Sequence, residues 1–440
     1  MSLPNLKPST SLANPLRILI VGAGVCGPAL AYFLQSSDPR HSITIIERSS
    51  ALRMAGQQID IKAQGLPVLK KMGLMDTIKK HLVAETGLDM VDTTGKTVAH
   101  FGIVDAAKGT VGLTSEYEIM RGDLVQVLYE ASLAQRAKAK ELGKEGGLTY
   151  EFGKTVTDFK QDNDGVDIIF SDGLKKRYDL VVAADGQMSR TRRHAFGQVA
   201  SDEAMRSLGV HAAYYSLPRV DGEGGLAKCY NAPGRKCIVT RTGDRPMTQV
   251  YLFNMNAADT ERLKKMEKEP VEKQKEVWAE AFKDVGWQAD RFLSGLNTCD
   301  DFYAHELAQV KMKPVYKGRV ALLGDAGYCP TPFTGLGTTL SITGAYLLAG
   351  ELARHGNDVP RALEAYDKVA RPLIDECQHL PSALVGAFLP SSRLGVWMFR
   401  NTMWAFSTFK INEMMHRVFP EDTGKAGWKV PDYPELNLLS

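Results

Sequence analysis

The sequence predicts an α/β fold. A strand–helix–strand domain is interrupted by a mostly antiparallel β-sheet domain and followed by a C-terminal helical segment. Three observations carry this prediction. An apolar strand, a glycine-rich turn and a helix follow one another at residues 17–34, and strand-like runs separated by turn signals fill residues 205–255. A buried strand and a second glycine turn then lead into an apolar helix at residues 320–352.

Length and composition are those of an ordinary globular protein. With 440 residues and 44% hydrophobic content, the chain can bury the cores of two domains, or of one domain with a large insertion. Its 54 basic and 51 acidic residues give a net charge of +3, which offers no bulk reason to expect nucleic acid as a partner. We therefore expect small-molecule chemistry.

The cysteines and the N-terminus indicate a cytoplasmic protein without a structural metal. Six cysteines are scattered with no C-x-x-C pair or Cys/His spacing, so neither a zinc site nor a disulfide framework is expected. Residues 1–15 are rich in Ser, Pro and Asn and lack the apolar core of a signal peptide. Residues 1–16 are accordingly predicted to form a disordered tail.

The first motif is a Rossmann-like βαβ unit. Gly22 allows the tight turn, Gly24 the close approach of a pyrophosphate to the helix N-terminus, and Gly27 the packing of helix on strand. Glu47 ends the next strand, where a carboxylate accepts hydrogen bonds from ribose hydroxyls and repels a 2′-phosphate. The unit therefore favours FAD or NAD over NADP, and the choice between those two needs the other motifs.

Polar residues after this unit are further candidates for cofactor contact. Arg48 follows Glu47 directly. Asp60 lies on a short strand between two isoleucines, where a carboxylate is either exposed at an edge or paired. Arg121 precedes a helix whose first turn holds Asp123. It either reaches the cofactor or forms a surface ion pair.

A second motif follows the buried strand at residues 180–184. The strand ends in Asp185 and Gly186, and Arg190 and Arg192 come soon after. Asp185 can fix this loop by accepting hydrogen bonds from backbone N–H groups, while the two arginines would form a positively charged surface that attracts phosphates. The plain alternative is an ordinary Asp-Gly turn.

The middle of the chain predicts two groups of antiparallel strands, with Asp-Gly turns in the first group. The first is a meander at residues 148–152, 156–161 and 166–170. The second comprises residues 209–217, 226–230, 236–242 and 247–255, followed by helices at 260–268 and 271–282. Such an inserted sheet is typical of a substrate domain.

Two strand faces of this sheet are candidates to line a substrate pocket. Gln249, Tyr251 and Phe253 share one face of the last strand, because side chains alternate along a strand. His211 and Tyr215 share one face of the first strand in the same way. The sequence does not choose between the two faces, and each of these residue types is also common in an ordinary sheet without a catalytic role.

The third motif lies at residues 319–338. A buried strand ends in Gly324 and Asp325, a loop holds Pro332 and Phe333, and a long helix opens with Gly335, Leu336 and Gly337. Small residues let the backbone approach a flat ligand, and the free N–H groups at a helix start stabilise a developing anion. A reduced flavin ring is such an anion.

Together the three motifs resemble the group A flavoprotein monooxygenases, which include para-hydroxybenzoate hydroxylase and the tetracycline-inactivating monooxygenases. The resemblance runs from about residue 17 to 371, and fungal secondary-metabolite hydroxylases of this family have a similar length. One departure is Thr343-Gly344-Ala345, where many members carry an Asp-Ala pair. The resemblance assigns flavin contacts to Gly22, Gly24, Gly27, Glu47, Arg48, Asp60, Arg121, Asp185, Gly186, Gly324, Asp325, Pro332, Gly335, Leu336 and Gly337.

The activity that the resemblance implies is oxygenation. NADPH or NADH would reduce noncovalent FAD and leave, since the sequence has no second G-x-G-x-x-G motif. O2 would then form a C4a-hydroperoxyflavin that hydroxylates or epoxidises an electron-rich aromatic, polyketide or alkaloid molecule. The alternatives are an FAD-dependent dehydrogenase or oxidase on the same fold, and a flavin-binding, membrane-associated accessory protein without turnover.

The predicted organisation is discontinuous. The FAD-binding domain takes residues 17–85, 115–204 and 302–372, the substrate domain takes 86–114 and 205–301, and residues 373–440 form a C-terminal helical segment. Residues 380–409 are apolar and aromatic, but Pro390, Arg393 and Arg400 interrupt any run long enough to span a bilayer. We favour a core-capping helix there over an interfacial membrane contact.

Overall fold

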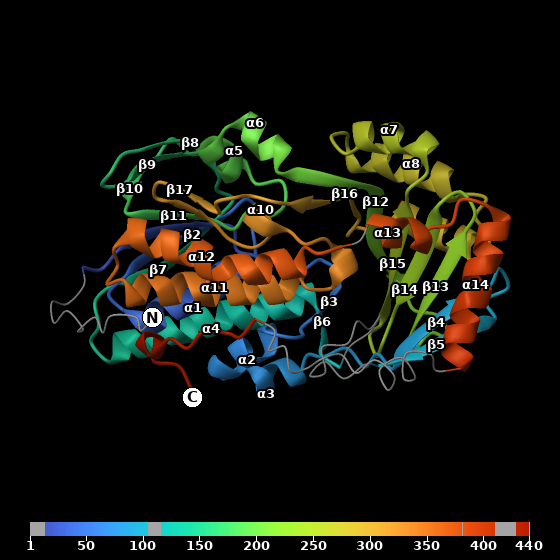
Figure 1. Ribbon diagram of the computed structural model, residues 1–440, viewed down its shortest axis with the longest axis horizontal. Helices are drawn as coiled ribbons and strands as arrows, with labels where there is room; N and C mark the ends of the chain where they lie inside the picture. Colours follow the sequence, from blue (N-terminus) through green and yellow to red (C-terminus); the bar gives the residue numbers. More distant parts are fainter. Residues whose placement is uncertain (1–13, 104–115, 381, 410–427, 440) are drawn as a thin grey trace, which may run out of the picture.

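A computed structural model describes residues 14–103, 116–380, 382–409 and 428–439 (Figure 1). It has the predicted α/β architecture, built around a six-stranded sheet in one half of the molecule and a seven-stranded sheet in the other. The six-stranded sheet runs, in order, through β17 (Tyr316–Lys317), β18 (Val320–Leu322), β11 (Leu180–Ala183), β1 (Arg17–Val21), β2 (Ser42–Glu47) and β7 (Gly147–Phe152). All neighbours are parallel except β17 and β18.

This sheet is buried on both faces, which explains the continuous apolar runs of its strands. Ile18 and Ile20 pack into the helical layer, whereas Leu19 and Val21 pack on the opposite side. The helical layer consists of α1 (Cys26–Ser37), α4 (Arg121–Glu141), α11 (Gly337–Arg354) and α12 (Val359–Cys377). Shorter helices nearby are α2 (Gly65–Lys71) and α3 (Met75–Lys79).

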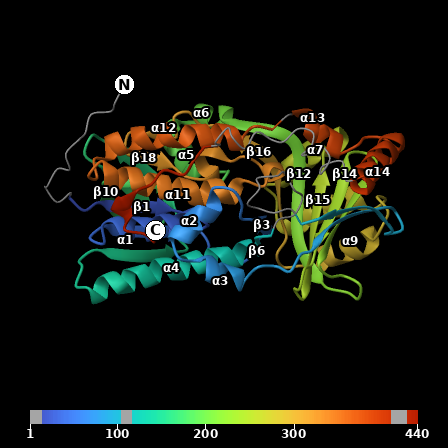
Figure 2. The same ribbon diagram turned by 60° about the horizontal axis from the view of Figure 1, so that its bottom comes forward.

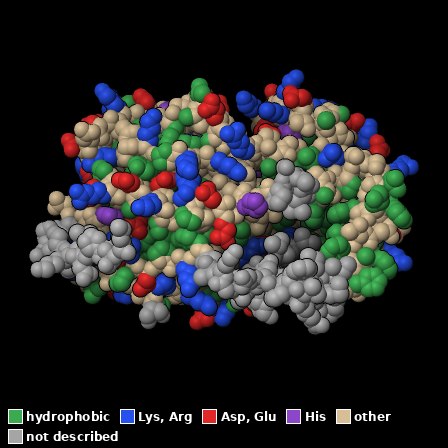
Figure 3. Space-filling view, viewed as in Figure 1, with side chains coloured by type: hydrophobic (Ala, Val, Ile, Leu, Met, Phe, Trp, Pro, Cys, Tyr) green, Lys and Arg blue, Asp and Glu red, His purple; other side chains and the backbone are tan. Residues whose placement is uncertain are grey.

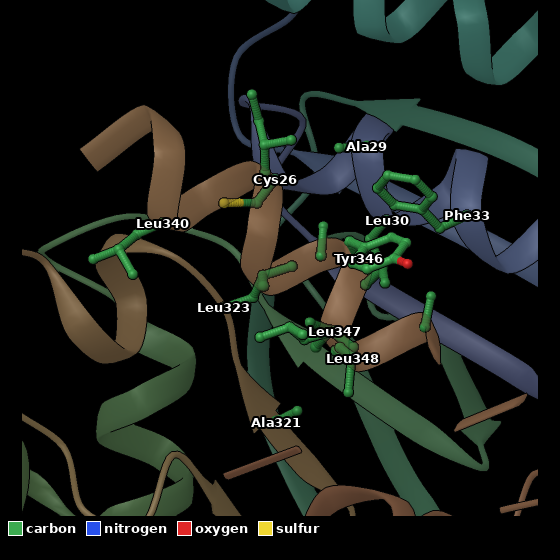
Figure 4. Close-up of a cluster of buried hydrophobic side chains, with 14 of the residues drawn as sticks. Cys26, Ala29, Leu30, Phe33, Ala321, Leu323, Leu340, Tyr346, Leu347 and Leu348 are labelled. Atoms are coloured by element: carbon green, nitrogen blue, oxygen red, sulfur yellow. The ribbon is translucent and has the colours of Figure 1, made fainter. Parts of the chain in front are cut away.

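The contact between α1 and α11 forms the centre of this core. Figure 4 shows Leu30 and Phe33 of α1 beside Tyr346 of α11, with Leu347 below the Tyr346 ring and Leu323 to its left. The rings of Phe33 and Tyr346 meet edge to face at 5.5 Å between centroids. These side chains are fully buried, so α11 is held rigidly over the strand ends that precede it in sequence.

The other face of the six-stranded sheet is covered by a smaller sheet and two short helices. The sheet contains β8 (Val156–Gln161), β9 (Val166–Phe170) and β10 (Lys175–Tyr178), and the helices are α5 (Arg190–Phe196) and α6 (Gln198–Glu203). The predicted meander is therefore wrong in its first strand. Residues 148–152 belong to β7, which pairs in parallel with β2. The reason is that α4 returns the chain to the edge of the six-stranded sheet, where the backbone N–H and C=O groups of β2 would otherwise be unpaired.

The seven-stranded sheet forms the second half. Its order is β16 (Tyr303–Val310), β12 (Met205–Pro218), β15 (Met247–Asn254), β14 (Lys236–Arg241), β13 (Leu226–Ala232), β4 (Gly87–Val91) and β5 (Thr97–Gly102). The four predicted strands of residues 209–255 are all present in it. Figure 2 shows the long strand β12 curving from the first half into this sheet.

Strand β16 departs from the predicted division of the chain. Residues 302–372 were assigned to the FAD-binding domain, yet β16 pairs with β12 from Met205 to Tyr214. The pairing satisfies the backbone groups of a β12 edge that would otherwise stay open. Residues 104–114 of the predicted substrate domain and residue 115 of the predicted FAD-binding domain lie outside the described residues.

Helices cover one face of the seven-stranded sheet. They are α7 (Ala257–Met266), α8 (Val271–Phe282) and α9 (Ala289–Thr298), of which α9 was not predicted. Their apolar side chains, including Trp278, Phe282 and Phe292, pack on this face. The opposite face is turned toward the first half of the molecule and is connected to it by β3 (Gln58–Asp60) and β6 (Glu118–Met120).

The C-terminal segment forms α13 (Ser382–Phe388) and α14 (Arg393–Thr408). The predicted core-capping role holds for one side of α14 only. Phe399 and Met403 pack against the sheet, whereas Leu394 and Trp397 are 65% and 62% exposed. Figure 3 shows hydrophobic side chains gathered at this edge of the molecule. Within the described ranges, no helix combines the length and apolar character that crossing a bilayer requires.

A buried histidine makes folding pH-dependent. His41 is 1% exposed, and its Nδ1 accepts a hydrogen bond from the Leu16 N–H at 2.9 Å. Burial lowers its pKa from 6.5 to about 4, so the folded protein holds the neutral ring. This contribution to stability is complete above pH 6.5 and is lost as the pH falls toward 4.

We therefore expect His41→Gln to flatten the acid side of the stability profile. In urea unfolding between pH 7.5 and 4.5, the advantage of the wild type over the variant should shrink by about 2 to 3 kcal/mol. Exposed His379, changed to Gln, is the control. A wild-type advantage that stays constant across this range would contradict the assignment.

Candidate cofactor and substrate site

The three sequence motifs meet at one edge of the six-stranded sheet. Strands β1, β11 and β18 are parallel neighbours, so their carboxyl ends lie side by side. The Ala184 N–H donates to the Val21 carbonyl, and the Leu323 N–H donates to the Ala183 carbonyl, each at 2.9 Å. A crevice outside the carboxyl ends of parallel strands is where α/β folds bind ligands.

Three glycines permit this convergence. A Cβ on Gly22, whose φ is +115°, would lie 2.4 Å from the Ala184 carbonyl oxygen. One on Gly27 would lie 2.2 Å from the Gly22 oxygen, and one on Gly324 would lie 2.4 Å from Cys26 Sγ. Protein packing alone therefore requires these three glycines.

Gly24 has a different environment. The nearest atom to a Cβ placed there would be Nη2 of Arg121, at 3.3 Å. Burial lowers the pKa of Arg121, and the charge of Arg53 lowers it further. In the described part of the chain, no carboxylate forms an ion pair with Arg121. A desolvated cation beside the glycine turn and the α1 N-terminus fits the pyrophosphate of a dinucleotide.

Glu47 lies beside the same turn. Its two carboxylate oxygens accept hydrogen bonds from the Ala23 N–H at 3.1 Å and the Ser49 N–H at 2.9 Å. These bonds orient the carboxylate, and its remaining lone pairs can accept from ribose hydroxyls. Arg48 is exposed, and no hydrogen bond or ion pair holds it among the described residues. The predicted cofactor contact of Arg48 therefore stays a prediction.

The loop at Asp185 is organised as the sequence suggested. Asp185 accepts hydrogen bonds from the Ser189 hydroxyl, and from the Thr191 N–H and hydroxyl at 3.1 and 3.0 Å. Gly186 takes φ +82°, which a side chain disfavours. Asp185 therefore holds the start of α5 beside the end of β11.

Arg192 corrects one expectation of the sequence. Its guanidinium is fully buried and forms no phosphate approach. It donates to the Ala326 carbonyl at 2.7 Å, to the Gln187 carbonyl at 2.9 Å and to the Ser201 hydroxyl at 2.9 Å. Arg192 therefore connects the Asp185 loop to α10 (Asp325–Tyr328), whereas Arg190 is exposed.

Asp60 is paired, and it lies against the glycine turn of the third motif. Lys62 Nζ is 3.1 Å from Asp60 Oδ2, and the Thr339 hydroxyl donates to the Lys62 carbonyl at 2.6 Å. A Cβ on Gly335, whose φ is +62°, would lie 2.7 Å from Lys62 Nζ. The short 3-10 helix Pro332–Thr334 precedes this turn, and α11 starts at Gly337.

Asp325 has the environment of a site residue. It lies at the start of α10, next to the backbone of Gly324. Burial raises its pKa, while the Cys329 thiol and the charge of Arg121 oppose this shift. A carboxylate between a buried cation and the strand ends can accept hydrogen bonds from a ligand in the crevice.

One of the two predicted strand faces meets the first half of the molecule. The Gln58 N–H of β3 donates to Gln249 Oε1 at 3.0 Å and to the Tyr251 hydroxyl oxygen at 3.1 Å. The Tyr251 hydroxyl donates to Gln249 Oε1 at 2.7 Å. Phe253 lies near Phe333 of the third motif, with 6.1 Å between ring centroids. This face is therefore the one beside the cofactor residues.

His211 and Tyr215 lie on the other face. The Tyr215 hydroxyl donates to the Phe292 carbonyl of α9 at 2.9 Å, and His211 Nδ1 is 3.3 Å from Glu267. Both residues face the helices that cover the sheet. They therefore do not line the junction with the cofactor half, because Tyr214 rather than Tyr215 shares the face of Tyr251.

Sequence reasoning missed a buried charged cluster and two tyrosines. Arg241 contacts Glu118 and lies 3.4 Å from Glu85, and Gln58 Nε2 donates to both carboxylates. Burial raises the pKa of Glu118 and of Glu85. Glu118 stands between Tyr117 and Ile119, the same signal that identified Asp60. The tyrosines, Tyr214 and Tyr303, carried no sequence signal of their own.

Comparison with known proteins agrees with this geometry. Residues 16–378 match the family described as FAD binding domain. The chain is 42% identical over 428 residues to the FAD-dependent monooxygenase asL6 of Sarocladium schorii, covering 96% of this chain and 99% of that protein. It is 30% identical over 426 residues to the monooxygenase CTB7 of Cercospora beticola, covering 95% and 97%. The crystal structure of tetracycline destructase Tet(51) superimposes with a TM-score of 0.74 at 26% identity, covering 96% and 100%.

The role of Glu47 can be tested by FAD titration. We expect Glu47→Arg to weaken FAD binding by about 1 to 3 kcal/mol, because a donor would replace the acceptor and leave ribose hydroxyls unpaired. Glu145→Arg, the same change at an exposed residue between α4 and β7, is the matched control and should leave the FAD dissociation constant unchanged. Equal FAD affinity in the wild type and a correctly folded Glu47→Arg variant would make Glu47 a structural residue only.

Proposed function

The chain belongs to the group A flavoprotein monooxygenases, an FAD-dependent family, as the match of its FAD binding domain and its relatives show. From this premise we propose that the protein uses NADPH or NADH and O2 to hydroxylate or epoxidise an electron-rich aromatic, polyketide-like or alkaloid-like molecule. The observation that carries the proposal is the junction of the two halves. There an aromatic strand face lies beside the glycine turn of the third motif.

The described residues fit FAD, which when bound would supply electron transfer from a nicotinamide and activation of O2. We assign the pyrophosphate to the Gly24 turn and Arg121, and the ribose to Glu47. Asp185 holds the loop that follows β11, and Asp325 lies at the start of α10, just after β18. The start of α11 presents free N–H groups and a positive dipole end, which favour negative charge on a flat ring.

The substrate side of the junction is aromatic. Tyr214, Tyr251, Phe253, Tyr303 and Phe333 lie in contact with one another along the sheet face. Such rings pack against a planar substrate and exclude water from the reacting atoms. This composition favours an aromatic substrate over a sugar or a charged metabolite.

A nicotinamide dinucleotide would bind transiently. The sequence contains one G-x-G-x-x-G motif, which we assign to FAD. Arg53 and Arg190 are exposed on segments next to the site, where they can attract phosphates without a dedicated domain. The choice between NADPH and NADH would then depend on whether such surface arginines bind the 2′-phosphate that only NADPH carries.

We expect the purified protein to be yellow and to release noncovalent FAD on heating. Oxidation of NADPH and NADH should be measured with O2 uptake over a panel of phenols, polyketides and alkaloids. Substrate-stimulated oxidation with a product heavier by one oxygen atom supports the proposal. Turnover that consumes no O2 indicates a dehydrogenase. A substrate that loses two electrons to O2 without NAD(P)H, with hydrogen peroxide formed, indicates an oxidase, whereas peroxide formed from NAD(P)H and O2 with no oxygenated product indicates uncoupled turnover.

Gly335→Val tests the third motif. A side chain there would meet the Lys62–Asp60 pair and would occupy a strained backbone conformation. We expect the variant to retain some FAD, since the residues at Gly22 and Glu47 are untouched. Coupled hydroxylation should fall about a hundredfold, with NADPH oxidation diverted to hydrogen peroxide, because a displacement of about 1 Å has that effect.

The matched control for this variant is Gly356→Val. Gly356 has φ +60°, close to that of Gly335, and a Cβ there would meet nothing within 4 Å. It therefore carries the same backbone strain outside the site. NADPH consumed, peroxide released and product formed should be measured side by side. A Gly335→Val enzyme as well coupled as Gly356→Val would remove this turn from the reactive site.

A further inference from the structure

The Tyr214 hydroxyl is buried without a hydrogen-bond partner. The side chain is 3% exposed, and no donor or acceptor in the described residues reaches its oxygen. The hydroxyls of Tyr215 and Tyr251 are satisfied, by Phe292 and by Gln249 respectively. A buried hydroxyl that lacks a partner destabilises the fold, and a ligand that supplies the partner removes that cost.

The position of Tyr214 points to a ligand at the junction. In the sheet register it lies opposite Tyr251 on one side and Tyr303 on the other. The hydroxyls of these neighbours reach the start of β3. The Tyr303 hydroxyl contacts Gln57, and the Tyr251 hydroxyl accepts from the Gln58 N–H. Tyr214 therefore lies between two residues that contact the cofactor half, and it alone contacts nothing there with its oxygen.

Rings surround Tyr214. It stacks on Tyr303 at 4.9 Å and 19° between planes, and on His305 at 5.7 Å and 23°. Tyr251 and Phe253 meet it edge to face at 5.1 and 6.2 Å. A partner that enters this environment has to be planar and apolar apart from the atom that contacts the hydroxyl.

The chemistry of the missing partner follows from the state of the hydroxyl. Burial raises the pKa of Tyr214 well above 10, and the neighbouring tyrosines add to the shift. The group therefore stays protonated and acts as a donor. Its O–H proton lacks an acceptor in the described part of the chain, and an oxygen on an aromatic ring meets both the planar and the acceptor requirement.

We propose that the Tyr214 hydroxyl donates a hydrogen bond to an oxygen carried by the ring of an aromatic substrate. The inference rests on the proposed function and narrows its substrate class to phenols and aryl ketones, in preference to ring systems without an oxygen acceptor. By anchoring that oxygen, Tyr214 also fixes which ring carbon is presented for oxidation.

The test compares Tyr214→Phe with Tyr215→Phe in the FAD-loaded enzyme. The two changes remove one hydroxyl each from adjacent residues on opposite faces of β12. Without ligand, Tyr214→Phe should leave Tm unchanged or higher, because it removes an unsatisfied group. Tyr215→Phe should lower Tm by roughly 2 °C, because the Phe292 carbonyl loses its donor.

Binding is measured from the change in flavin absorbance with resorcinol, 4-hydroxyacetophenone and emodin as probes. For each probe that the wild type binds, Tyr214→Phe should raise the dissociation constant by about 5- to 50-fold. Tyr215→Phe should remain within about twofold of the wild type. For a probe that is oxygenated, Tyr214→Phe should also change the ratio of product isomers, a readout that a purely structural role would not move.

Three results would overturn the proposal. Unchanged dissociation constants for every probe would show that the hydroxyl contacts no ligand. A weaker FAD affinity in Tyr214→Phe would assign the hydroxyl to the cofactor. A loss of Tm equal to that of Tyr215→Phe would reveal a structural partner. If the probes bind and their binding depends on Tyr214 but no oxygenated product forms, the hydrogen bond stands and the proposed oxygenation fails. If no probe binds while the wider panel yields an oxygenated product, the inference about Tyr214 fails and the proposed function stands.

Discussion

The structure depends on the close contact of three chain segments at the carboxyl ends of β1, β11 and β18. Gly22 touches the backbone at Ala184, Gly27 touches Gly22, and Gly324 touches Cys26, with no room for a Cβ at any of them. Parallel pairing places the carboxyl ends of these neighbouring strands at the same edge of the sheet, although they lie far apart in the sequence. Once they meet, the helix N-termini and the loops that follow must surround the same crevice, and Arg192 holds two of these loops together from beneath.

The second constraint is the junction between the two halves. The Gln58 N–H donates to Gln249 and Tyr251 of the seven-stranded sheet, and its side chain donates to Glu85 and Glu118. Arg241 contacts Glu118 and lies 3.4 Å from Glu85. Burying these charges is costly unless every partner is in place, so the cluster selects one arrangement of the halves more than it adds stability. That arrangement sets the aromatic strand face against the Gly335 turn.

The departure at Thr343-Gly344-Ala345 has a local physical reason. A Cβ on Gly344 would lie 2.1 Å from the Tyr328 hydroxyl, which in turn is 2.8 Å from the Tyr366 hydroxyl. Tyr366 donates onward to the Leu322 carbonyl at 3.2 Å. The space beside α11 is thus filled by two tyrosines that connect α10, α12 and β18. A neutral hydrogen-bonded pair holds the helix here, without an acidic residue at that point of the sequence.

The sequence by itself determined the three motifs, because each is a local succession of strand, turn and helix in which glycine and acid positions have fixed geometric roles. It also determined that Gln249, Tyr251 and Phe253 share a face, since alternation along a strand is local. It could not choose between that face and the one of His211 and Tyr215, and it misassigned β7, β16 and Arg192. Each of these assignments depends on contacts between residues far apart in the chain: β7 pairs with β2, β16 pairs with β12, and Arg192 donates to the Ala326 carbonyl. Tyr214 shows the limit most clearly, because its sequence neighbours are ordinary sheet residues. Only the folded arrangement places its hydroxyl among aromatic rings, without a hydrogen-bond partner in the described residues.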